Sequence, residues 1–184
     1  ILKDRDSNSN NNNWNIWHKD AGDGDDYGYF TNAAFTGSAQ VIGTDNNVFT
    51  LKPNLATTNE SGDNYIAYLF HSVEGYCKVG NYIGNGVADG PFVYTGFRPS
   101  WLLVKRASGG VGHWDIFDNK RETFNEMGNQ LYASQATQEA SNDHDIDFLS
   151  NGFKWRDASG SVNSSGTYIY MAFAESPFKY SNAR

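Results

Sequence analysis

Short apolar runs of about four to eight residues, each bounded by Gly, Asn, Asp or Ser, follow one another along the chain. Runs of this length between turn-forming residues are typical of β-strands. The best candidate for a 3.6-residue apolar period, residues 119–127, predicts only one short helix or a turn. We therefore expect an all-β chain, with strands near residues 1–5, 13–18, 27–31, 39–43, 47–52, 64–72, 76–83, 91–95, 100–106, 113–118, 130–133, 145–149, 152–156 and 167–175.

The expected strands differ in how their polar positions alternate. Carboxylates fall on one face of residues 145–149, which predicts a half-solvated outer strand. Residues 65–70 and 168–174 are apolar on both faces. Such strands are expected to lie centrally in a sheet, with a layer of structure against each face or a partner subunit covering one face.

The second half of the chain repeats the first at a spacing of about 100 residues, as a duplicated supersecondary unit does. The matched blocks are WNIWH at 14–18 with WDIFD at 114–118, FTLK at 49–52 with FKWR at 153–156, NESG at 59–62 with NSSG at 163–166, and YIAYLF at 65–70 with YIYMAF at 168–173. The pattern predicts a jelly-roll-like β-sandwich built from two homologous repeats, residues 1–80 and 81–184. The repeats form either two small sandwiches or one larger sandwich.

The repeat carries two further expectations. Equivalent residues are expected at equivalent depths, so Trp14 and Trp114 are both assigned to a core, and Ile66 is expected at the depth of Ile169. The second copy has residues 90–106 ahead of its Trp114 block, whereas the first copy begins inside the matching stretch. We expect the leading strand of the first copy to come from upstream sequence or from another chain.

Composition narrows the classes of partner. The formal net charge of −7 and the pI of about 4.9 disfavour binding to nucleic acid or to anionic lipid. No apolar run reaches the roughly 18 residues that a membrane-spanning helix needs, so no membrane insertion is expected. A single cysteine, Cys77, excludes an internal disulfide and is interpreted as a small buried side chain.

The candidate chemical motifs favour structural roles. Glycine spacing and a following strand make residues 84–90 a turn, not a dinucleotide loop. Residues 20–26 carry four Asp residues without the EF-hand spacing, which indicates a solvated acidic turn. Asp143, Asp145 and Asp147 predict an exposed strand face, in preference to a metal site or a glycosidase pair. We expect no catalytic residue, no metal ligand and no cofactor, and we assign no such role to His18, His71 or His113.

Turn and tip chemistry indicates where a ligand would bind. Asn59 and Asn163 each begin an Asn-x-Ser-Gly sequence, which is expected to form a turn in which Gly takes a positive φ. The tips at residues 8–13, 20–26 and 108–112 differ between the copies, so we place ligand binding in these tips. The candidate residues are Asn10, Asn12, Asp23, Asp25 and Gly110. Phe97, Trp101 and Lys105 lie in or beside strands and are expected to serve packing and solubility.

Several blocks together resemble a recurring module of tailed bacteriophages, common in marine podoviruses and myoviruses. These blocks are YIAYLFHSVEGY at 65–76, GNG at 84–86, DGPFVYTGFRP at 89–99, VKR at 104–106, DNKR at 118–121, IDFLSNGFK at 146–154 and YIYMAFAESPFK at 168–179. The resemblance covers nearly the whole chain.

The resemblance implies a non-enzymatic virion protein, a tail-fibre or receptor-binding module for attachment to the host. It also implies a homotrimer that contacts other virion tail proteins, and a host-surface glycan or outer-membrane protein as receptor. Such a protein assembles in the host cytoplasm and acts on the virion. The alternatives are a purely structural fibre or decoration module and, less favoured, a glycan-degrading tail spike.

Overall fold

In this computed structural model, residues 1–6, 13–22, 26–37, 41–45, 47–55 and 57–177 are described, and this part is built from strands, turns and loops, which confirms the all-β expectation. Each expected strand has a counterpart, and β4 is additional. The strands are β1 (Leu2–Asp4), β2 (Trp14–Trp17), β3 (Asp26–Gly28), β4 (Thr36–Gly37), β5 (Val41–Thr44), β6 (Phe49–Leu51), β7 (Tyr65–Ala67), β8 (Cys77–Gly84), β9 (Phe92–Tyr94), β10 (Pro99–Arg106), β11 (Trp114–Asp118), β12 (Leu131–Tyr132), β13 (Ile146–Leu149), β14 (Gly152–Trp155) and β15 (Gly166–Ala174).

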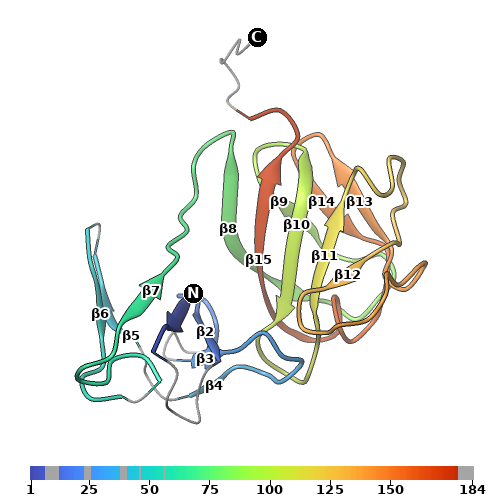
Figure 1. Ribbon diagram of the computed structural model, residues 1–184. Coiled ribbons are helices and arrows are strands. Elements are labelled where there is room, and N and C mark those ends of the chain that lie inside the picture. Colours follow the sequence, from blue (N-terminus) through green and yellow to red (C-terminus); the bar gives the residue numbers. More distant parts are fainter. Residues whose placement is uncertain (7–12, 23–25, 38–40, 46, 56, 178–184) are drawn as a thin grey trace.

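The strands form four antiparallel sheets (Figure 1). The large sheet has the order β12-β11-β10-β15-β8, and a three-stranded sheet, β13-β14-β9, packs on one of its faces. The small sheet has the order β4-β3-β2-β1-β7, and β5 and β6 form a separate hairpin. Nowhere in the described part does a helix long and apolar enough to span a bilayer occur. The division at residues 80 and 81 stays a prediction; β8 crosses it and belongs to the large sheet.

The main core lies between the large sheet and the three-stranded sheet. It is rich in aromatic rings, with Phe117, Phe153, Trp155 and Tyr168 fully buried. The Trp155 ring meets Phe117 edge-on at 5.5 Å between centroids. Burial of so much aromatic surface supplies the dominant favourable term for this half of the molecule.

The opposite face of the large sheet is covered by residues from the first part of the chain. Trp114 is the centre of this second cluster, where Phe30 and Phe35 lie 5.2 and 6.2 Å from its ring. Its indole N–H donates to the carbonyl oxygen of Tyr29 at 2.8 Å. Both faces of β15 are therefore packed, which explains why its side chains are apolar on both faces. This agrees with the central position expected for residues 168–174.

Lys105 has a different role from the expected one in solubility, because its side chain is fully buried. Its ammonium donates hydrogen bonds to the carbonyl oxygens of Ala33 at 2.7 Å and Gly112 at 2.6 Å. Burial lowers the pKa of Lys105 to about 8, although the nearby Asp115 opposes this shift. The sequence prediction failed here because the covering segment is about 70 residues away in the chain.

The expectation of equal depths for matched residues is also wrong. Trp14 pairs with Lys3 as Trp114 pairs with Lys105, yet Trp14 is 39% exposed and Trp114 only 4%. Ile66 is 38% exposed, against 4% for Ile169. The cause is tertiary: the first part of the chain covers the face that carries Trp114 and Ile169, whereas no such layer covers Trp14 and Ile66 within the described residues.

The strand at residues 65–70 departs from its expected central position. β7 is the outermost strand of the small sheet, opposite β4, and the chain leaves regular pairing after Ala67. Leu69 is 69% exposed and Phe70 is also exposed. The alternative of a covering partner subunit stays a prediction.

The turn predictions hold. Gly62 and Gly166 both have positive φ, at 100° and 148°. Asn163 is fully buried and its side-chain amide donates to the carbonyl oxygens of Val87 and Asp157, so this side chain fixes the turn. Residues 119–121 form a turn, one of the two outcomes expected for residues 119–127.

Replacing Lys105 by Met should lower the free energy of unfolding by about 1–3 kcal/mol, because buried carbonyl oxygens lose their donor. The measurement is denaturant unfolding, with the exposed Lys120→Met as the matched control. Equal stability of the two variants would contradict the anchoring role of Lys105.

Candidate functional site

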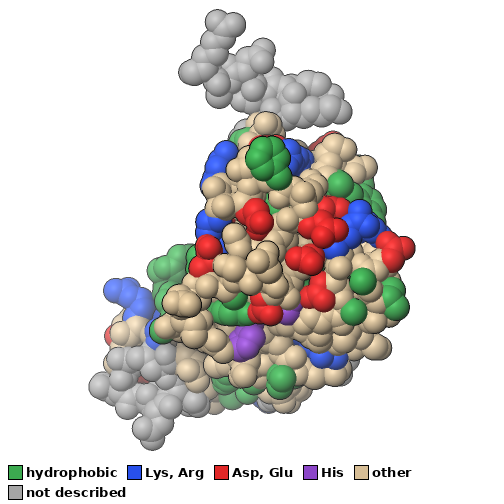
Figure 2. Space-filling model, turned by 90° about the vertical axis from the view of Figure 1, so that its right-hand side faces the viewer, with side chains coloured by type: hydrophobic (Ala, Val, Ile, Leu, Met, Phe, Trp, Pro, Cys, Tyr) green, Lys and Arg blue, Asp and Glu red, His purple; other side chains and the backbone are tan. Residues whose placement is uncertain are grey.

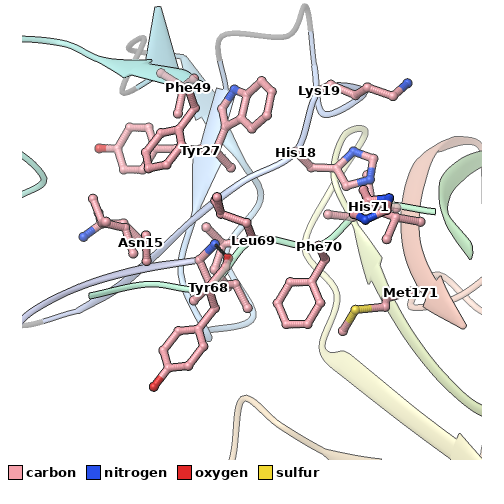
Figure 3. Close-up of a pocket in the computed structure, with 18 of the residues that line it drawn as sticks. Asn15, His18, Lys19, Tyr27, Phe49, Tyr68, Leu69, Phe70, His71 and Met171 are labelled. Atoms are coloured by element: carbon pink, nitrogen blue, oxygen red, sulfur yellow. Dashed lines mark hydrogen bonds between the residues drawn. The ribbon is translucent and has the colours of Figure 1, made fainter. Parts of the chain in front are cut away.

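A cavity of about 390 Å³ opens where the small sheet, the β5–β6 hairpin and the large sheet meet (Figure 3). A volume of this order suits a small ligand or part of a chain. Most of the lining is apolar. The described residues that line it are Ile1, Leu2, Asn15, Ile16, Trp17, His18, Lys19, Tyr27, Val41, Thr44, Phe49, Leu51, Thr58, Ala67, Tyr68, Leu69, Phe70, His71, Ser72, Val79, Leu103, Trp114, Ile169, Tyr170 and Met171.

The cavity walls follow from strand alternation. Leu2 and Ala67 are paired neighbours on β1 and β7, and they point to the same face of the small sheet. The aromatic and aliphatic side chains of Phe49 and Leu51 on β6 also line the space. In Figure 3, Tyr27 and Phe49 lie on one side and His18 and His71 on the other, with Leu69 and Phe70 lower in the centre of the view. A ligand in the cavity would therefore meet mainly hydrophobic surface.

His18 supplies a polar group in this apolar surround. Its Nδ1 accepts the backbone N–H of Asp20 at 3.1 Å, which places the proton of the neutral ring on Nε2. That Nε2 is buried and has no partner among the described residues. Burial lowers the pKa of His18 to about 4; Asp20 opposes this shift and Lys19 adds to it. The ring is therefore a neutral hydrogen-bond donor at pH 7.

Asn15 supplies the complementary group. Its amide nitrogen donates to the carbonyl oxygen of Thr57 at 3.0 Å. Its Oδ1 is buried and has no partner within the described part of the chain. Asn15 and His18 thus add polar side chains to a mainly apolar lining, a composition typical of binding sites.

The cavity has little charge. Among the described lining residues Lys19 is the only one with a charged side chain, and no carboxylate is included. The described lining therefore contains no carboxylate pair for acid–base chemistry. The described residues contain no group of three or more His, Cys, Asp or Glu side chains that could hold a metal ion.

The predicted tip residues are only partly visible. Asn10, Asn12, Asp23 and Asp25 lie outside the described residues. Gly110 is described, with a φ of 153°. The Arg106 guanidinium holds the surrounding tip by donating to the carbonyl oxygens of Ser108, Gly109 and Ser165. This tip is thus fixed to the scaffold and lies outside the cavity lining.

The acidic strand is less exposed than the sequence predicts. Asp147 is buried and pairs with Arg156 at 2.6 Å. Asp143 is exposed, and its carboxylate accepts hydrogen bonds from Tyr132 at 2.6 Å and from Gln130. Figure 2 shows acidic and basic side chains interspersed on one face of the molecule. The exposed-face expectation is wrong for Asp147, whose buried carboxylate is paired with the guanidinium of Arg156, the residue that follows β14.

Sequence reasoning missed the cavity. It assigned no functional role to His18 or His71, although both line the cavity. The available signal was that residues 65–70 are apolar on both faces, which left their covering layer unaccounted for. Cys77, in contrast, is buried as predicted, and its thiol donates to the carbonyl oxygen of His71.

Comparison with known proteins identifies a family for this chain. A family model described as a domain of unknown function, DUF7483, matches residues 1–177. Neither the search of curated proteins nor the search of solved structures found a match.

The buried neutral His18 predicts an acid-sensitive term in stability. The unfolded state, with a histidine pKa of about 6.5, binds more protons than the folded state, with a pKa of about 4. The free energy of unfolding should therefore fall by roughly 3 kcal/mol as the pH drops from 6.5 to 4. In His18→Asn this contribution should vanish, whereas His71→Asn should retain it. Parallel pH profiles for wild type and His18→Asn would refute the buried neutral state.

Proposed function

Because the chain belongs to the DUF7483 family, whose description names no activity, we propose a function from its geometry and from its resemblance to phage tail modules. The chain acts as a non-enzymatic attachment and assembly module of a tailed-bacteriophage virion, within a tail-fibre or other tail-associated protein. One observation carries the proposal: an apolar cavity lies beside the outermost strand of the small sheet, where another polypeptide can dock.

The proposal assigns assembly and receptor binding to two different surfaces. The cavity and β7 serve assembly, because they expose backbone edge and apolar side chains together. The loop tips, chiefly residues 8–13 and 20–26, serve contact with a host-surface glycan or outer-membrane protein. Many such modules on one particle would give avidity from weak single contacts.

The proposal includes self-association as a homotrimer. Exposed apolar side chains support it, with Trp14 and Tyr68 in aromatic contact at 5.9 Å and both exposed. Clustered apolar surface of this kind commonly marks an interface. The single cysteine suits assembly in a reducing host cytoplasm, before the virion is released.

A purely structural fibre or decoration module is the second candidate. Phe92 and Tyr94 favour it, because both are exposed on β9 and available to pack against a neighbouring subunit. A glycan-degrading spike is less favoured, because the carboxylates of the acidic strand are engaged: Asp147 with Arg156 and Asp143 with Tyr132.

The virion assignment predicts that antibodies raised against the purified protein label particles of the phage that encodes it. Immunogold micrographs should place the label at the distal end of the tail. Label on the shaft or capsid would favour the structural candidate, and particles without label would contradict both.

Replacing residues 8–13 by a short Gly-Asn turn should lower adsorption of the virion to its host and leave the melting temperature nearly unchanged, because surface loops tolerate shortening. A companion variant replaces residues 108–112, the other predicted tip, and its melting temperature is measured separately because Gly112 accepts a hydrogen bond from Lys105. Adsorption that survives both replacements would shift the conclusion to the structural candidate.

The trimer predicts a molar mass in light scattering of three chains at micromolar concentration. Apolar surface around Trp14 should drive this association, so Trp14→Ser should weaken it. The exposed Phe124→Ser serves as the control. A stable, soluble monomer of the wild-type chain would count against self-association.

A further inference from the structure

The small and large sheets pair their strands in the same registers. Lys3 lies opposite Trp14 on one side and Ile66 on the other. Lys105 likewise lies between Trp114 and Ile169. Matching Lys3 with Lys105 therefore matches β1, β2 and β7 with β10, β11 and β15, so the large sheet shows what surrounds a strand in the position of β7.

In the large sheet that strand carries a further neighbour. β8 pairs antiparallel with β15 along its length, from Gly166 opposite Gly84 to Phe173 opposite Cys77. Tyr82 of β8 enters the main core, where its ring stacks on Tyr168 at 4.9 Å between centroids. Its hydroxyl donates to the carbonyl oxygen of Val162 at 2.6 Å. β8 thus supplies both backbone partners and a core side chain.

The corresponding edge of β7 has no pairing strand among the described residues. Tyr68 exchanges backbone hydrogen bonds with Ile1, and Asn64 accepts one from Arg5, so alternate residues of this segment face β1. The backbone groups of Tyr65, Ala67 and Leu69 face the other way, and no described residue pairs with them. Ala67 and Leu69 are exposed, although both line the cavity. An open edge beside an apolar cavity is the geometry of a strand acceptor.

We infer that β7 accepts a β-strand from a different protein of the assembly. The strand pairs antiparallel as β8 does on β15 and inserts apolar side chains at alternate positions into the cavity. This inference rests on the assembly role proposed above and names its partner: an extended segment with alternating apolar or aromatic residues. The main chain of the partner bonds to Tyr65, Ala67 and Leu69. Its alternate side chains meet Leu2 and Phe49 in the cavity.

The cavity also sets which side chain fits. Gly80 of β8 lies opposite Tyr170, and a Cβ on Gly80 would come within 2.9 Å of the Tyr170 hydroxyl. Tyr170 lies opposite Val104 in the large sheet, and Ala67 lies opposite Leu2 in the small sheet. Because Leu2 matches Val104, Ala67 takes the place of Tyr170. Tyr170 leaves room only for glycine at the opposite position of its partner strand, whereas the smaller side chain of Ala67 leaves space there for a larger residue. The accepted strand should therefore carry a large apolar residue opposite Ala67.

The probe is a labelled synthetic peptide with the sequence of residues 76–85, in which Cys77→Ser prevents oxidation and Lys78→Val places an apolar side chain on the same side as Tyr82. Fluorescence anisotropy with the full chain measures its binding, and hydrogen exchange locates it. We expect binding, with slower amide exchange at Tyr65, Ala67 and Leu69. A peptide that also carries Gly80→Leu should bind more tightly, by about threefold to tenfold, because added methylene groups fill the cavity.

The decisive protein variant is Ala67→Pro. It removes an amide on the open edge and leaves the bonds of Ile66 and Tyr68 to β1 available. The matched control is Ile83→Pro on β8. The backbone groups of Val79 bond to the Ser72 hydroxyl and so point away from β15. Ile83 lies four residues further along the same strand, so its backbone groups point to the same edge. We expect Ala67→Pro to weaken peptide binding about tenfold, and Ile83→Pro to leave it within about twofold. Circular dichroism with matching melting curves verifies that both variants fold.

Three results would overturn the inference. One is no binding of either peptide at about 1 mM, where even weak edge pairing is detectable. Another is equal binding by wild type and Ala67→Pro. The third is a dimer of the chain itself that Ala67→Pro dissolves, because the occupant of the edge is then a second copy. Virions that carry the antibody label while the peptide fails to bind would leave the proposed function standing. A peptide that binds while virions lack the label would support the acceptor edge and overturn the virion assignment.

Discussion

Both faces of the large sheet have to be kept from water, and the rest of the molecule is arranged around this requirement. Val104 and Leu103 are neighbours on β10 that point to opposite faces, and both are buried. The three-stranded sheet covers the first face. The second face needs a cover from elsewhere in the chain, and residues 29–35 supply it through Trp114 and Lys105.

Covering the large sheet determines what remains exposed on the small sheet. Ile16 packs into the shared cluster, whereas Trp14 on the same strand stays exposed. The side of the small sheet that faces β5 and β6 encloses a cavity instead of a filled core. Two sets of strands with the same pairing registers therefore end as a closed sandwich and an open one. Binding is proposed at the open one, because there the edge strand β7 lies beside an apolar cavity.

Buried polar groups are present in both halves. In the large half, Lys105 donates to a set of carbonyl oxygens and Asp147 pairs with a guanidinium. Buried polar atoms without a partner among the described residues also occur in both halves, for example His18 Nε2 in the small half and Gln130 Oε1 in the large half. Each such atom costs free energy, so these atoms do not distinguish the cavity from the rest of the molecule. The apolar surface and the strand edge of β7 carry that distinction.

Within the described residues, the sequence alone determined the fold class, the approximate positions of the strands and the turn chemistry. These features depend on residues close together in the chain: the continuous apolar run at residues 168–174, or a glycine with positive φ at Gly62 and Gly166. Tertiary structure decided which apolar faces are covered. Trp14 and Trp114 occupy the same register but differ in burial, because distant residues 29–35 pack on only one of them. The cavity escaped prediction for the same reason, since it arises where two sheets and a hairpin meet and no local pattern encodes that meeting.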